Sequence, residues 1–239
     1  RATTGAIEEV WISGSGSQHP YEPTFRVIGK SKPLGICGSG LISLLAEMFV
    51  TGVMDKAGNI NLSLAAENPR LREGDHGPEY VIAWAHETAH HRDIVITNVD
   101  IDNLKRAKAA IYAGFTVLAD NVGVPLELID QLLIGGSCGK YINIEKAIQV
   151  GLLPALPWPR IQCLGNPSIR GAYHALLNGN ARDKIANIAN RMTYIELSAD
   201  NTFYDAFMSA MFFPHTDLNA FPSVQAVVEE QASKIAGSA

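Results

Sequence analysis

The sequence contains 239 residues, of which 47% are hydrophobic and 18% charged, and it carries a formal net charge of -5. This composition is ordinary for a globular protein with a sizeable core, and the lack of a basic excess argues against nucleic acid or an anionic membrane as a partner. The three cysteines, Cys37, Cys138 and Cys163, form no close pair, which argues against a disulfide scaffold or a cysteine-ligated iron–sulfur cluster in this segment.

The chain shows no targeting segment. No apolar run approaches the ~20 residues of a membrane helix, and no signal peptide precedes the first predicted strand. We therefore expect a cytoplasmic protein. Because residue 1 is Arg rather than Met and the chain runs straight into a strand-like segment, we also expect a fragment of a longer protein.

The first fifty residues predict a hairpin followed by a helix. The alternation over 5–12 indicates a strand, and 25–29 predicts its hairpin partner. Gly38, Ser39 and Gly40 then precede a predicted helix over 41–49. The free N–H groups and positive dipole end of such a helix suit an anion, so these three residues are candidate phosphate-side contacts. Glycine punctuation before a packed helix explains them as well, and their spacing matches no phosphate loop.

The middle of the chain predicts two strands and a long helix. Polar, irregular sequence over 55–80 leads into predicted strands at 80–85 and 94–97. Residues 97–100 form a capping pattern for an alanine-rich helix over 101–122, in which apolar side chains recur at helical spacing. Gly123 ends this helix, because glycine suits the left-handed backbone of a helix end.

The segment His86-Glu87-Thr88-Ala89-His90 matches the zinc-protease signature, in which two histidines share one face of a helix. Here the motif lies between two predicted strands. Residues four apart in an extended chain are separated by ~13 Å, too far to share a zinc ion. We therefore reject a metalloprotease, name no metal site, and expect a solvated turn whose histidines titrate near neutrality.

The apolar run Leu132-Leu133-Ile134 ends abruptly at Gly135 and Gly136. Three consecutive aliphatic residues predict a buried parallel strand, and ligands of open α/β sheets bind at the carboxyl ends of such strands. The two glycines would let a ligand approach the backbone closely, although a tight strand-to-helix turn needs them equally.

The remaining chain alternates predicted helices and strands. We expect helices over 144–150, 168–178, 181–196 and 202–211, a strand over 160–164, and a further strand ending near Leu197. The sequence 212–217 breaks this pattern, and from Val224 onward the chain is a polar tail, either helical or frayed. We thus expect one unit over 1–223 and a C-terminal tail over 224–239.

Several short motifs stand in an order that resembles one protein family. They are RA and GAIE within 1–8, GICGSGLI at 35–42, RDIVIT at 92–97, LKRAKAAI at 104–111, IGGSCGKYI at 134–142, GLLP at 151–154, GN at 165–166 and FPHTDL at 213–218. In this order they resemble the C-terminal actin-like ATPase (ASKHA) domain of the reductive activators of corrinoid proteins. The resemblance covers nearly the whole chain.

The resemblance implies an α/β fold of the RNase H-like type, with a mixed sheet flanked by helices. The chain would be the C-terminal half of the two-lobed actin-like ATPase domain. Pro167-Ser168-Ile169-Arg170-Gly171-Ala172 resembles the second connecting motif of that superfamily, in which a small-residue helix packs against its counterpart in the other half. Gly171 and Ala172 would then act at the hinge, although ordinary tight packing explains them equally well.

The resemblance also implies an adenosine site. Gly135, Gly136 and Ser137 match the adenosine motif of the superfamily, in which glycine backbone lies against the nucleoside. Lys105 and Lys108 match the helix that borders adenine and ribose in related ATPases. The two lysines are three residues apart on one helix face, and a solvated helix face is the alternative interpretation.

Departures from the family pattern limit the expected site. No Asp-x-Gly-Thr phosphate motif occurs in the sequence. The family's phosphate-binding turns, and the domain that carries its [2Fe–2S] cluster, lie before the point where this chain begins. The expected fragment therefore supplies the adenosine side of an ATP–Mg²⁺ site, and its catalytic residues are unknown.

The resemblance implies an intact enzyme that uses ATP to reduce a Co(II) corrinoid protein to Co(I) for methyl transfer. The expected partner is a corrinoid iron–sulfur protein or a methyltransferase or O-demethylase corrinoid subunit, and a homodimer is a further expectation. The isolated fragment is expected to be inactive. Two alternatives stay open: a small-molecule kinase on the same fold, and a non-catalytic nucleotide-gated docking module.

Overall fold

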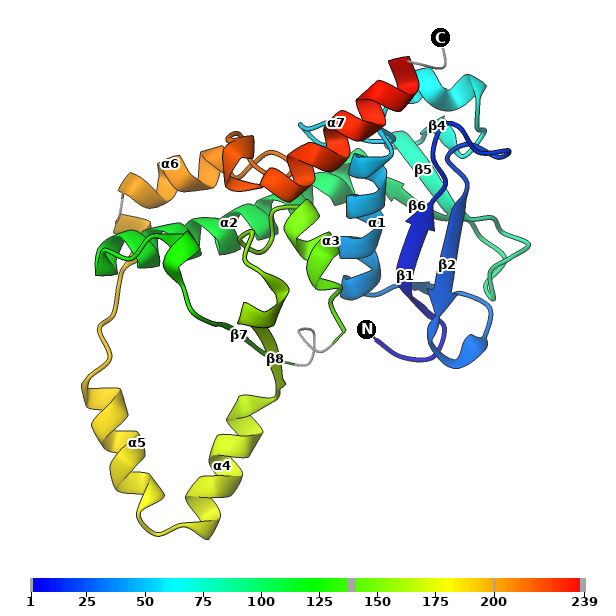
Figure 1. Cartoon of the computed structure of the whole chain (residues 1–239). Coiled ribbons are helices and arrows are strands. Elements are labelled where there is room, and N and C mark those ends of the chain that lie inside the picture. Colours follow the sequence, from blue (N-terminus) through cyan, green and yellow to red (C-terminus); the bar gives the residue numbers. More distant parts are fainter. Residues whose placement is uncertain (1, 137–140, 200, 237–239) are drawn as a thin grey trace.

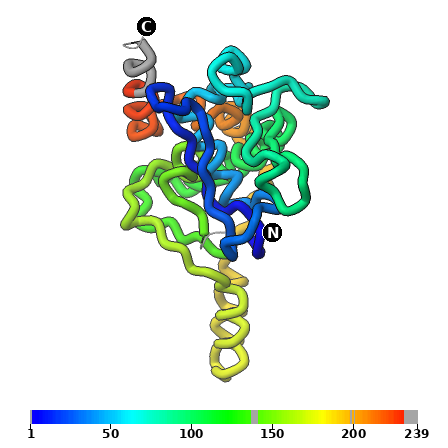
Figure 2. Tube along the Cα trace, turned by 90° about the vertical axis from the view of Figure 1, so that its right-hand side faces the viewer, coloured from blue at the N-terminus to red at the C-terminus, as the bar shows by residue number. Residues whose placement is uncertain are grey.

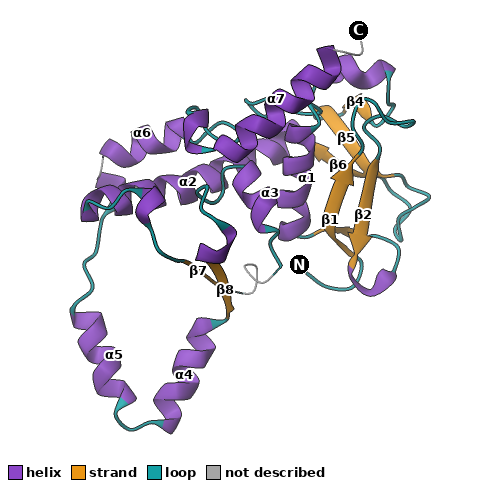
Figure 3. Ribbon diagram, in the orientation of Figure 1, coloured by secondary structure: helices purple, strands orange, loops and turns teal. Residues whose placement is uncertain are grey.

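The computed structural model describes residues 2–136, 141–199 and 201–236. These residues form a mixed α/β arrangement in which three small sheets are accompanied by helices, as Figure 1 and Figure 3 show. Two clusters of buried side chains form the interior. One lies around the first two sheets and the other around the long central helix and the C-terminal segments.

The N-terminal sheet contains the predicted hairpin. Strand β1 (Ala6–Ile12) pairs antiparallel with β2 (Pro23–Val27) and parallel, over its first two residues, with β3 (Gly35–Ile36). Helix α1 (Gly38–Val50) follows β3 and lies along β1 (Figure 1). The predicted strand, hairpin and helix are therefore confirmed, with small shifts of their ends.

Side chains of α1 bond to the backbone of β1. The Oγ atom of Ser43 accepts a hydrogen bond from Val10 N at 2.9 Å and donates one to Val10 O at 2.8 Å. The Oε2 atom of Glu47 accepts a hydrogen bond from Ile12 N at 3.0 Å. Backbone groups of a strand that lack a strand partner are satisfied in this way. These bonds fix the helix against the strand and thereby set the position of the α1 N-terminus.

The second sheet has the order β4-β5-β6. It consists of β4 (Leu71–Gly74), β5 (Gly77–Ala83) and β6 (Ile94–Thr97), all antiparallel. The expectation of irregular chain over 55–80 is wrong at β4 and at the 3-10 helix Leu62–Ala66. A four-residue strand with charged side chains has no clear period of its own. It forms because Leu71 pairs with Tyr80 and both are buried.

The zinc-protease motif lies in the loop between β5 and β6 rather than on a helix. Within this loop the Thr88 hydroxyl bonds to Ala85 O at 3.1 Å and to Arg92 O at 2.9 Å. The two histidines of the motif are therefore held by a turn, in which they do not share a helix face.

The central helix α2 (Asn98–Val122) begins and ends as the sequence predicts. Thr97 and Asp100 form a reciprocal capping box at its start. Gly123 ends it with a φ of 66°, in the left-handed region. A 3-10 turn (Leu126–Leu128) then leads into the third sheet.

The third sheet is a pair of parallel strands, β7 (Leu132–Gly135) and β8 (Ile161–Gly165). The prediction of a parallel strand at β7 is confirmed, but the prediction that this strand is buried is wrong, because the Leu133 side chain is 51% exposed. Helix α3 (Ile144–Gln149) lies between the two strands in sequence and packs against α1.

Two further helices follow β8. They are α4 (Pro167–Leu177) and α5 (Ala181–Asn190), which project from the rest of the molecule in Figure 1 and Figure 2. A 3-10 turn at Leu197–Ala199 occupies the place of the strand that we expected near Leu197, so that expectation is wrong.

The C-terminal segments return to the body of the molecule. Helix α6 (Asn201–Ser209) packs on α2, and α7 (Pro222–Ala236) follows a 3-10 turn at Leu218–Ala220. The predicted boundary between 223 and 224 falls inside α7. Val224 is 1% exposed and belongs to the second buried cluster, so the start of the predicted tail is part of the packed structure.

Candidate functional site

The largest group of predicted site residues meets at an apolar cavity between α1 and α2. The cavity has a volume of about 450 Å³. It is lined by residues of both helices and of three later segments: Gly38, Ser39, Ile42, Leu45, Leu104, Ala107, Lys108, Ile111, Ile142, Val150, Leu152 and Phe213. The structure thus brings the predicted phosphate-side residues Gly38 and Ser39 to the same cavity as the predicted adenosine-side Lys108.

A smaller polar pocket of about 290 Å³ adjoins this cavity, because Ser39 and Ile142 line both. Its other lining residues come from the first sheet, α1 and the segment before α3: Glu8, Glu9, Arg26, Ser43, Tyr141 and Asn143. Arg26 bonds to Glu8 Oε1 at 2.8 Å through Nε and to Glu9 Oε2 at 2.9 Å through Nη2. The two carboxylates of the pocket are therefore already paired with a cation.

Lys108 is buried, with 4% of its surface exposed, and its ammonium group bonds to backbone. Its Nζ atom donates to the carbonyl oxygen of Pro214 at 2.7 Å and also to that of Phe212, and it lies 5.2 Å from the centre of the Phe213 ring. Burial, with a smaller contribution from the Lys105 charge, lowers the Lys108 pKa to about 7. Lys108 therefore anchors the segment 212–214 at the cavity wall.

Lys105 lies one turn earlier on α2 and does not line the cavity. Its Nζ atom donates to Ala57 O at 2.7 Å and forms an ion pair with Asp102 at 2.6 Å. The predicted pair of lysines on one helix face is thus divided. Lys108 faces the cavity, whereas Lys105 bonds to Ala57, in the loop before the 3-10 helix Leu62–Ala66.

The residues at the start of α1 have two roles: Gly40 packs against β1, and Gly38 and Ser39 line the cavity. A side chain at Gly40 would overlap the carbonyl oxygen of Ile7, so glycine is needed there for α1 to approach β1. The Ser39 hydroxyl lies 3.2 Å from the Cys37 sulfur, and Cys37 also bonds to Ile7 O at 3.3 Å. Of the three predicted residues, Gly40 has the packing explanation, and Gly38 and Ser39 reach the cavity.

Gly135 and Gly136 lie at the carboxyl end of β7, next to the carboxyl end of β8. Gly136 has a φ of 106° and donates its N–H to Gly165 O, and Gly165 also has a positive φ of 70°. Neither Gly135 nor Gly136 lines the described cavities. Ser137, the third residue of the predicted motif, lies outside the described residues. Tyr141, which lines the polar pocket, is five residues after Gly136, so at most ~18 Å separates their Cα atoms.

The predicted hinge residues are on an exposed helix. Gly171 and Ala172 lie in α4, and a side chain added at Gly171 would meet no described atom within 4 Å. Their role at a hinge stays a prediction.

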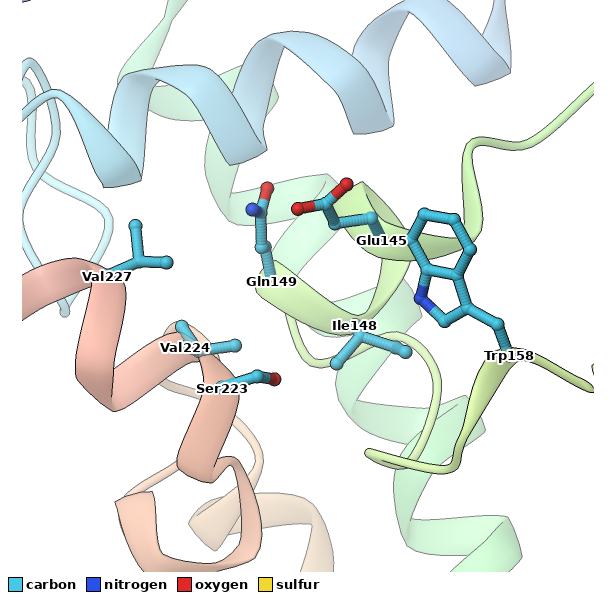
Figure 4. A pocket seen from close by; sticks show the side chains of 7 residues that line it. All are labelled: Glu145, Ile148, Gln149, Trp158, Ser223, Val224 and Val227. Atoms are coloured by element: carbon cyan, nitrogen blue, oxygen red, sulfur yellow. The ribbon is translucent and has the colours of Figure 1, made fainter.

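Another pocket holds none of the predicted residues. It has a volume of about 180 Å³ and lies between α3, α7 and Trp158. Figure 4 shows Glu145, Ile148 and Gln149 on one wall, with the Trp158 ring at one end and the valines of α7 at the other. Its small volume makes it a packing gap between helices rather than a nucleotide site.

Sequence reasoning missed the polar pocket and the role of the segment 212–216. The pocket depends on pairing between β1 and β2, which places Arg26 beside Glu8 and Glu9. The motif FPHTDL at 213–218 overlaps the segment 212–216, but the sequence alone does not show that Lys108 bonds to this segment.

The described part of the chain offers no metal centre. No group of three or more His, Cys, Asp or Glu side chains is placed to hold a metal ion there. Cys37 and Cys163 are free cysteines, and they belong to different parts of the fold. These residues do not fit a [2Fe–2S] cluster, which requires four closely placed ligands. Among the described helices, none combines the length and apolar character of a membrane span.

Comparison with known proteins decides the family. A protein-family model described as the C-terminal domain of RACo, the ASKHA domain, matches residues 1–225. The chain belongs to this family. The predicted fold class is thereby confirmed as an ASKHA domain with mixed α/β structure.

The relatives of the chain are activators and reductases of corrinoid proteins. The corrinoid activation enzyme RamQ of Eubacterium limosum is 34% identical over 218 residues, which are 89% of this chain and 36% of RamQ. The [Co(II) methylated amine-specific corrinoid protein] reductase of Methanosarcina barkeri is 24% identical over 184 residues, 75% of this chain and 29% of the reductase.

A solved structure supports the same assignment. The reductive activator for corrinoid,iron-sulfur protein is 47% identical and superposes with a TM-score of 0.85, covering 94% of this chain and 35% of the activator. The chain thus spans about a third of the length of the relatives that it matches.

Proposed function

We propose that this chain is the adenosine-binding part of an ATP-dependent activator that reduces a Co(II) corrinoid protein to the Co(I) form. Its membership of the activator family is the observation that carries the proposal. The names of its relatives refer to activation or reduction of corrinoid proteins. Because the chain spans about a third of these relatives, the activity is proposed for the whole activator rather than for this chain alone.

The nucleotide would lie across the two adjoining cavities. The apolar cavity between α1 and α2 offers side chains such as Leu104 and Ile111 to a flat base. The N-terminus of α1, with Ser39 at the junction of both cavities, offers N–H groups and a positive dipole end toward the phosphates. Gly135, Gly136 and Ser137 would approach the nucleoside from the end of β7.

The two lysines of α2 would act differently from each other. Lys108 would shape the base pocket by holding Phe213 at its wall, since its N–H groups already bond to backbone carbonyls. Lys105 would border the site from the preceding turn of α2, where Asp102 balances its charge.

The described residues do not form a dedicated Mg²⁺ site. Glu8 and Glu9 are the carboxylates that line the polar pocket on the proposed phosphate side, and both are paired with Arg26. We therefore derive no step through the metal and none through the iron–sulfur cluster. Both would depend on parts of the activator outside this chain.

The role of the nucleotide would be conformational. Reduction adds one electron to cobalt, and the reduced iron–sulfur part of the activator loses one. A nucleotide can favour this transfer only by binding one conformation of the complex more tightly than another. The chain's own contribution would be to bind the base and to transmit closure through α1 and α2.

Nucleotide titration of this chain tests the proposed site. Stabilisation by a ligand equals RT ln(1 + [L]/Kd), so ATP, ADP and adenosine should each raise the melting temperature in a concentration-dependent way. Uridine and UTP serve as controls for base selectivity. The absence of any adenosine-dependent shift would contradict the site assignment.

A second experiment tests the activity with an intact activator. The Co(II) corrinoid protein, a low-potential electron donor and the activator are combined with or without ATP, and Co(I) is followed by absorbance. We expect Co(I) only with ATP. Consumption of ATP that requires a small phosphate acceptor would instead support the kinase alternative.

A further inference from the structure

The cavity between α1 and α2 offers few polar side chains to a bound base. Nine of its twelve lining residues have apolar side chains, and one is a glycine. The two polar side chains are those of Ser39 and Lys108. Ser39 also lines the adjoining polar pocket, so it lies on the side that we propose for the phosphates. Among the described residues, this leaves Lys108 as the polar side chain on the base side, away from the polar pocket.

The hydrogen bonds of Lys108 are already committed. Its Nζ atom donates to the carbonyl oxygens of Phe212 and Pro214, and 4% of the residue is exposed. Because burial lowers its pKa to about 7, the amine is mostly neutral at pH 8. A neutral amine has two N–H donors, and the two carbonyls take both. Lys108 therefore has no free N–H for a base at this pH.

The backbone of the cavity wall is also largely paired. Three lining residues outside α1 and α2 have N–H groups that already donate to carbonyl oxygens: Val150 at 3.1 Å, Leu152 at 2.9 Å and Phe213 at 2.9 Å. The lining residues inside α2, and those of α1 beyond its first turn, bond within their helices. Free N–H groups remain at Gly38 and Ser39, at the start of α1 on the phosphate side.

A purine base that enters such a cavity gives up hydrogen bonds to water along its polar edge. Adenine carries an amino group there, whereas hypoxanthine and guanine carry a carbonyl and an N–H, and guanine adds a second amino group. A buried polar group without a partner weakens binding by roughly tenfold to a hundredfold. A site that does bond to a polar group behaves in the opposite way, because it rejects an analogue that lacks the group.

We propose that this cavity selects the base by the cost of burying its polar edge and not by hydrogen bonds to that edge. The site takes nucleotides of weakly polar purines as a class. Purine without an exocyclic group binds at least as tightly as adenine, hypoxanthine binds less tightly, and guanine binds least. This inference rests on the proposed function, since it requires the base to lie between α1 and α2.

Titration with four diphosphates tests the order. The 5′-diphosphates of purine riboside, adenosine, inosine and guanosine share ribose and phosphates, so ratios of their Kd values at pH 8 isolate the base. We expect purine riboside diphosphate to match ADP or bind more tightly, and IDP and GDP to bind about fivefold and about twentyfold more weakly than ADP. A purine riboside diphosphate that binds about tenfold more weakly than ADP would reveal a hydrogen bond to the 6-amino group and overturn the proposal. Equal Kd values for all four would place the base in water, with the same consequence.

Ala107→Trp separates failure of this inference from failure of the nucleotide site. Ala107 lines the cavity, so the indole ring occupies the volume proposed for the base. If Ala107→Trp weakens ADP binding but the 6-amino group proves necessary, the base lies in the cavity and only the selection rule is wrong. If the unsubstituted chain binds no ADP, or Ala107→Trp binds it equally well, the site assignment fails and this inference fails with it.

A polar group added to the wall should change the selectivity. Ile111 and Leu118 are exposed residues of α2, 48% and 53% exposed, and of the two only Ile111 lines the cavity. The amide of Ile111→Asn supplies a donor and an acceptor to the base edge, so the ratio of the GDP Kd to the ADP Kd should fall by about threefold or more. Leu118→Asn is the matched control and should leave the ratio unchanged. An unchanged ratio in a folded Ile111→Asn protein would contradict burial of the base edge against this wall.

Lys108→Met tests whether the lysine reads the base. Loss of Lys108 removes the anchor of Phe213 at the cavity wall, so all four nucleotides should bind more weakly by a common factor and keep their order. A melting curve without nucleotide first establishes that the variant is folded. If the folded variant binds the four diphosphates with equal Kd values, Lys108 reads the base edge and the proposal is wrong.

Discussion

The Nζ atom of Lys108 lies 2.7 Å from the carbonyl oxygen of Pro214, 106 residues later in the chain. This contact joins the middle of α2 to the segment that carries Phe213. Phe213 is fully buried in the first cluster, whereas Phe221, a few residues later, is buried in the second. Lys108 therefore helps to hold the two buried clusters together.

Replacing Lys108 should destabilise the chain. Lys108→Met keeps the length of the side chain but leaves the carbonyls of Phe212 and Pro214 without their donor. An unsatisfied buried acceptor costs ~1–3 kcal/mol, so we expect the free energy of unfolding to fall by about 2 kcal/mol. Urea unfolding at pH 7.5 measures this change.

Lys105→Met is the matched control for Lys108→Met. Lys105 is also largely buried along its stem, but its ammonium group donates to one partly buried carbonyl, that of Ala57, and is paired with the half-exposed carboxylate of Asp102. Such pairs contribute ~0–1 kcal/mol. An equal loss in the two variants would show that the contacts of Lys108 with 212–214 have no special weight.

The stability of the chain should rise with pH above neutrality because of Lys108. Its folded pKa is about 7, against an ordinary value of 10.5, so between these values the unfolded chain binds more protons than the folded chain. The free energy of unfolding then increases with pH, by up to ~1.4 kcal/mol per pH unit. Below about pH 7 both states are protonated and this contribution to the slope vanishes.

The upper end of this pH window is set by tyrosine. Burial raises the pKa of Tyr112 to about 12, so above pH 10 the unfolded chain loses this proton first and stability falls again. The measurement is the urea midpoint from pH 6.5 to about 11, for the unsubstituted chain and for Lys108→Met. Equal slopes in the two proteins would rule out Lys108 as the source.

Lys146 forms a second buried cationic contact, and its loss should cost more. Its Nζ atom forms an ion pair with Glu47 at 2.9 Å and donates to Val10 O at 2.6 Å and Ser43 Oγ at 2.8 Å. Removing one partner of a buried ion pair costs ~3–5 kcal/mol, because the other charge is left unpaired. Glu47 is partly exposed, so we expect a loss near ~3 kcal/mol for Lys146→Met.

Double substitution checks the mechanism of the Lys146 effect. Lys146→Met combined with Glu47→Gln should lose less stability than the sum of the two single changes, since neither charge is then left alone. Lys184→Met on α5, whose side chain is exposed, should stay within ~0.5 kcal/mol of the unsubstituted chain. Additive losses would argue against a coupled pair.

Gly151 should tolerate a side chain less well than Gly123. Both have a positive φ, 71° and 66°, so alanine at either position costs ~1–2 kcal/mol in backbone strain. At Gly151 the added methyl would also overlap the carbonyl oxygen of Pro214, whereas at Gly123 it meets open space. We expect Gly151→Ala to lower the melting temperature clearly more than Gly123→Ala, and equal shifts would refute the overlap.

Local signals predicted much of the fold. The capping box of Thr97 and Asp100 and the left-handed Gly123 define α2, because each depends on residues close in sequence. Strand β4 was missed, since four residues with two charges form a strand only through pairing with β5. The burial of Leu133 was predicted wrongly, because its burial would require a layer that the sequence of this chain does not supply.

The candidate site was predictable in its parts but not in its assembly. The sequence singled out Ser39 and Lys108 separately, and packing of α1 against α2 places both on one cavity. Helical spacing also paired Lys105 with Lys108, yet the bonds of Lys108 go to a segment over 100 residues away. Contacts of such sequence separation depend on the complete fold, which a periodicity argument does not contain.

Filling the apolar cavity should weaken nucleotide binding without unfolding the chain. Ala107 is an exposed residue of α2 that lines the cavity, so Ala107→Trp would occupy the volume proposed for the base. Leu118→Trp, on the same helix but outside the cavity, is the matched control. Isothermal titration with ADP should show at least a tenfold rise in Kd for Ala107→Trp and less than a twofold change for Leu118→Trp.

Both substitutions replace an exposed residue by a larger one. Similar melting temperatures of the two variants without nucleotide would therefore confirm that folding is intact. Unchanged ADP affinity in a folded Ala107→Trp protein would place the base elsewhere, and the end of β7 at Gly135 and Gly136 would then be the next position to test.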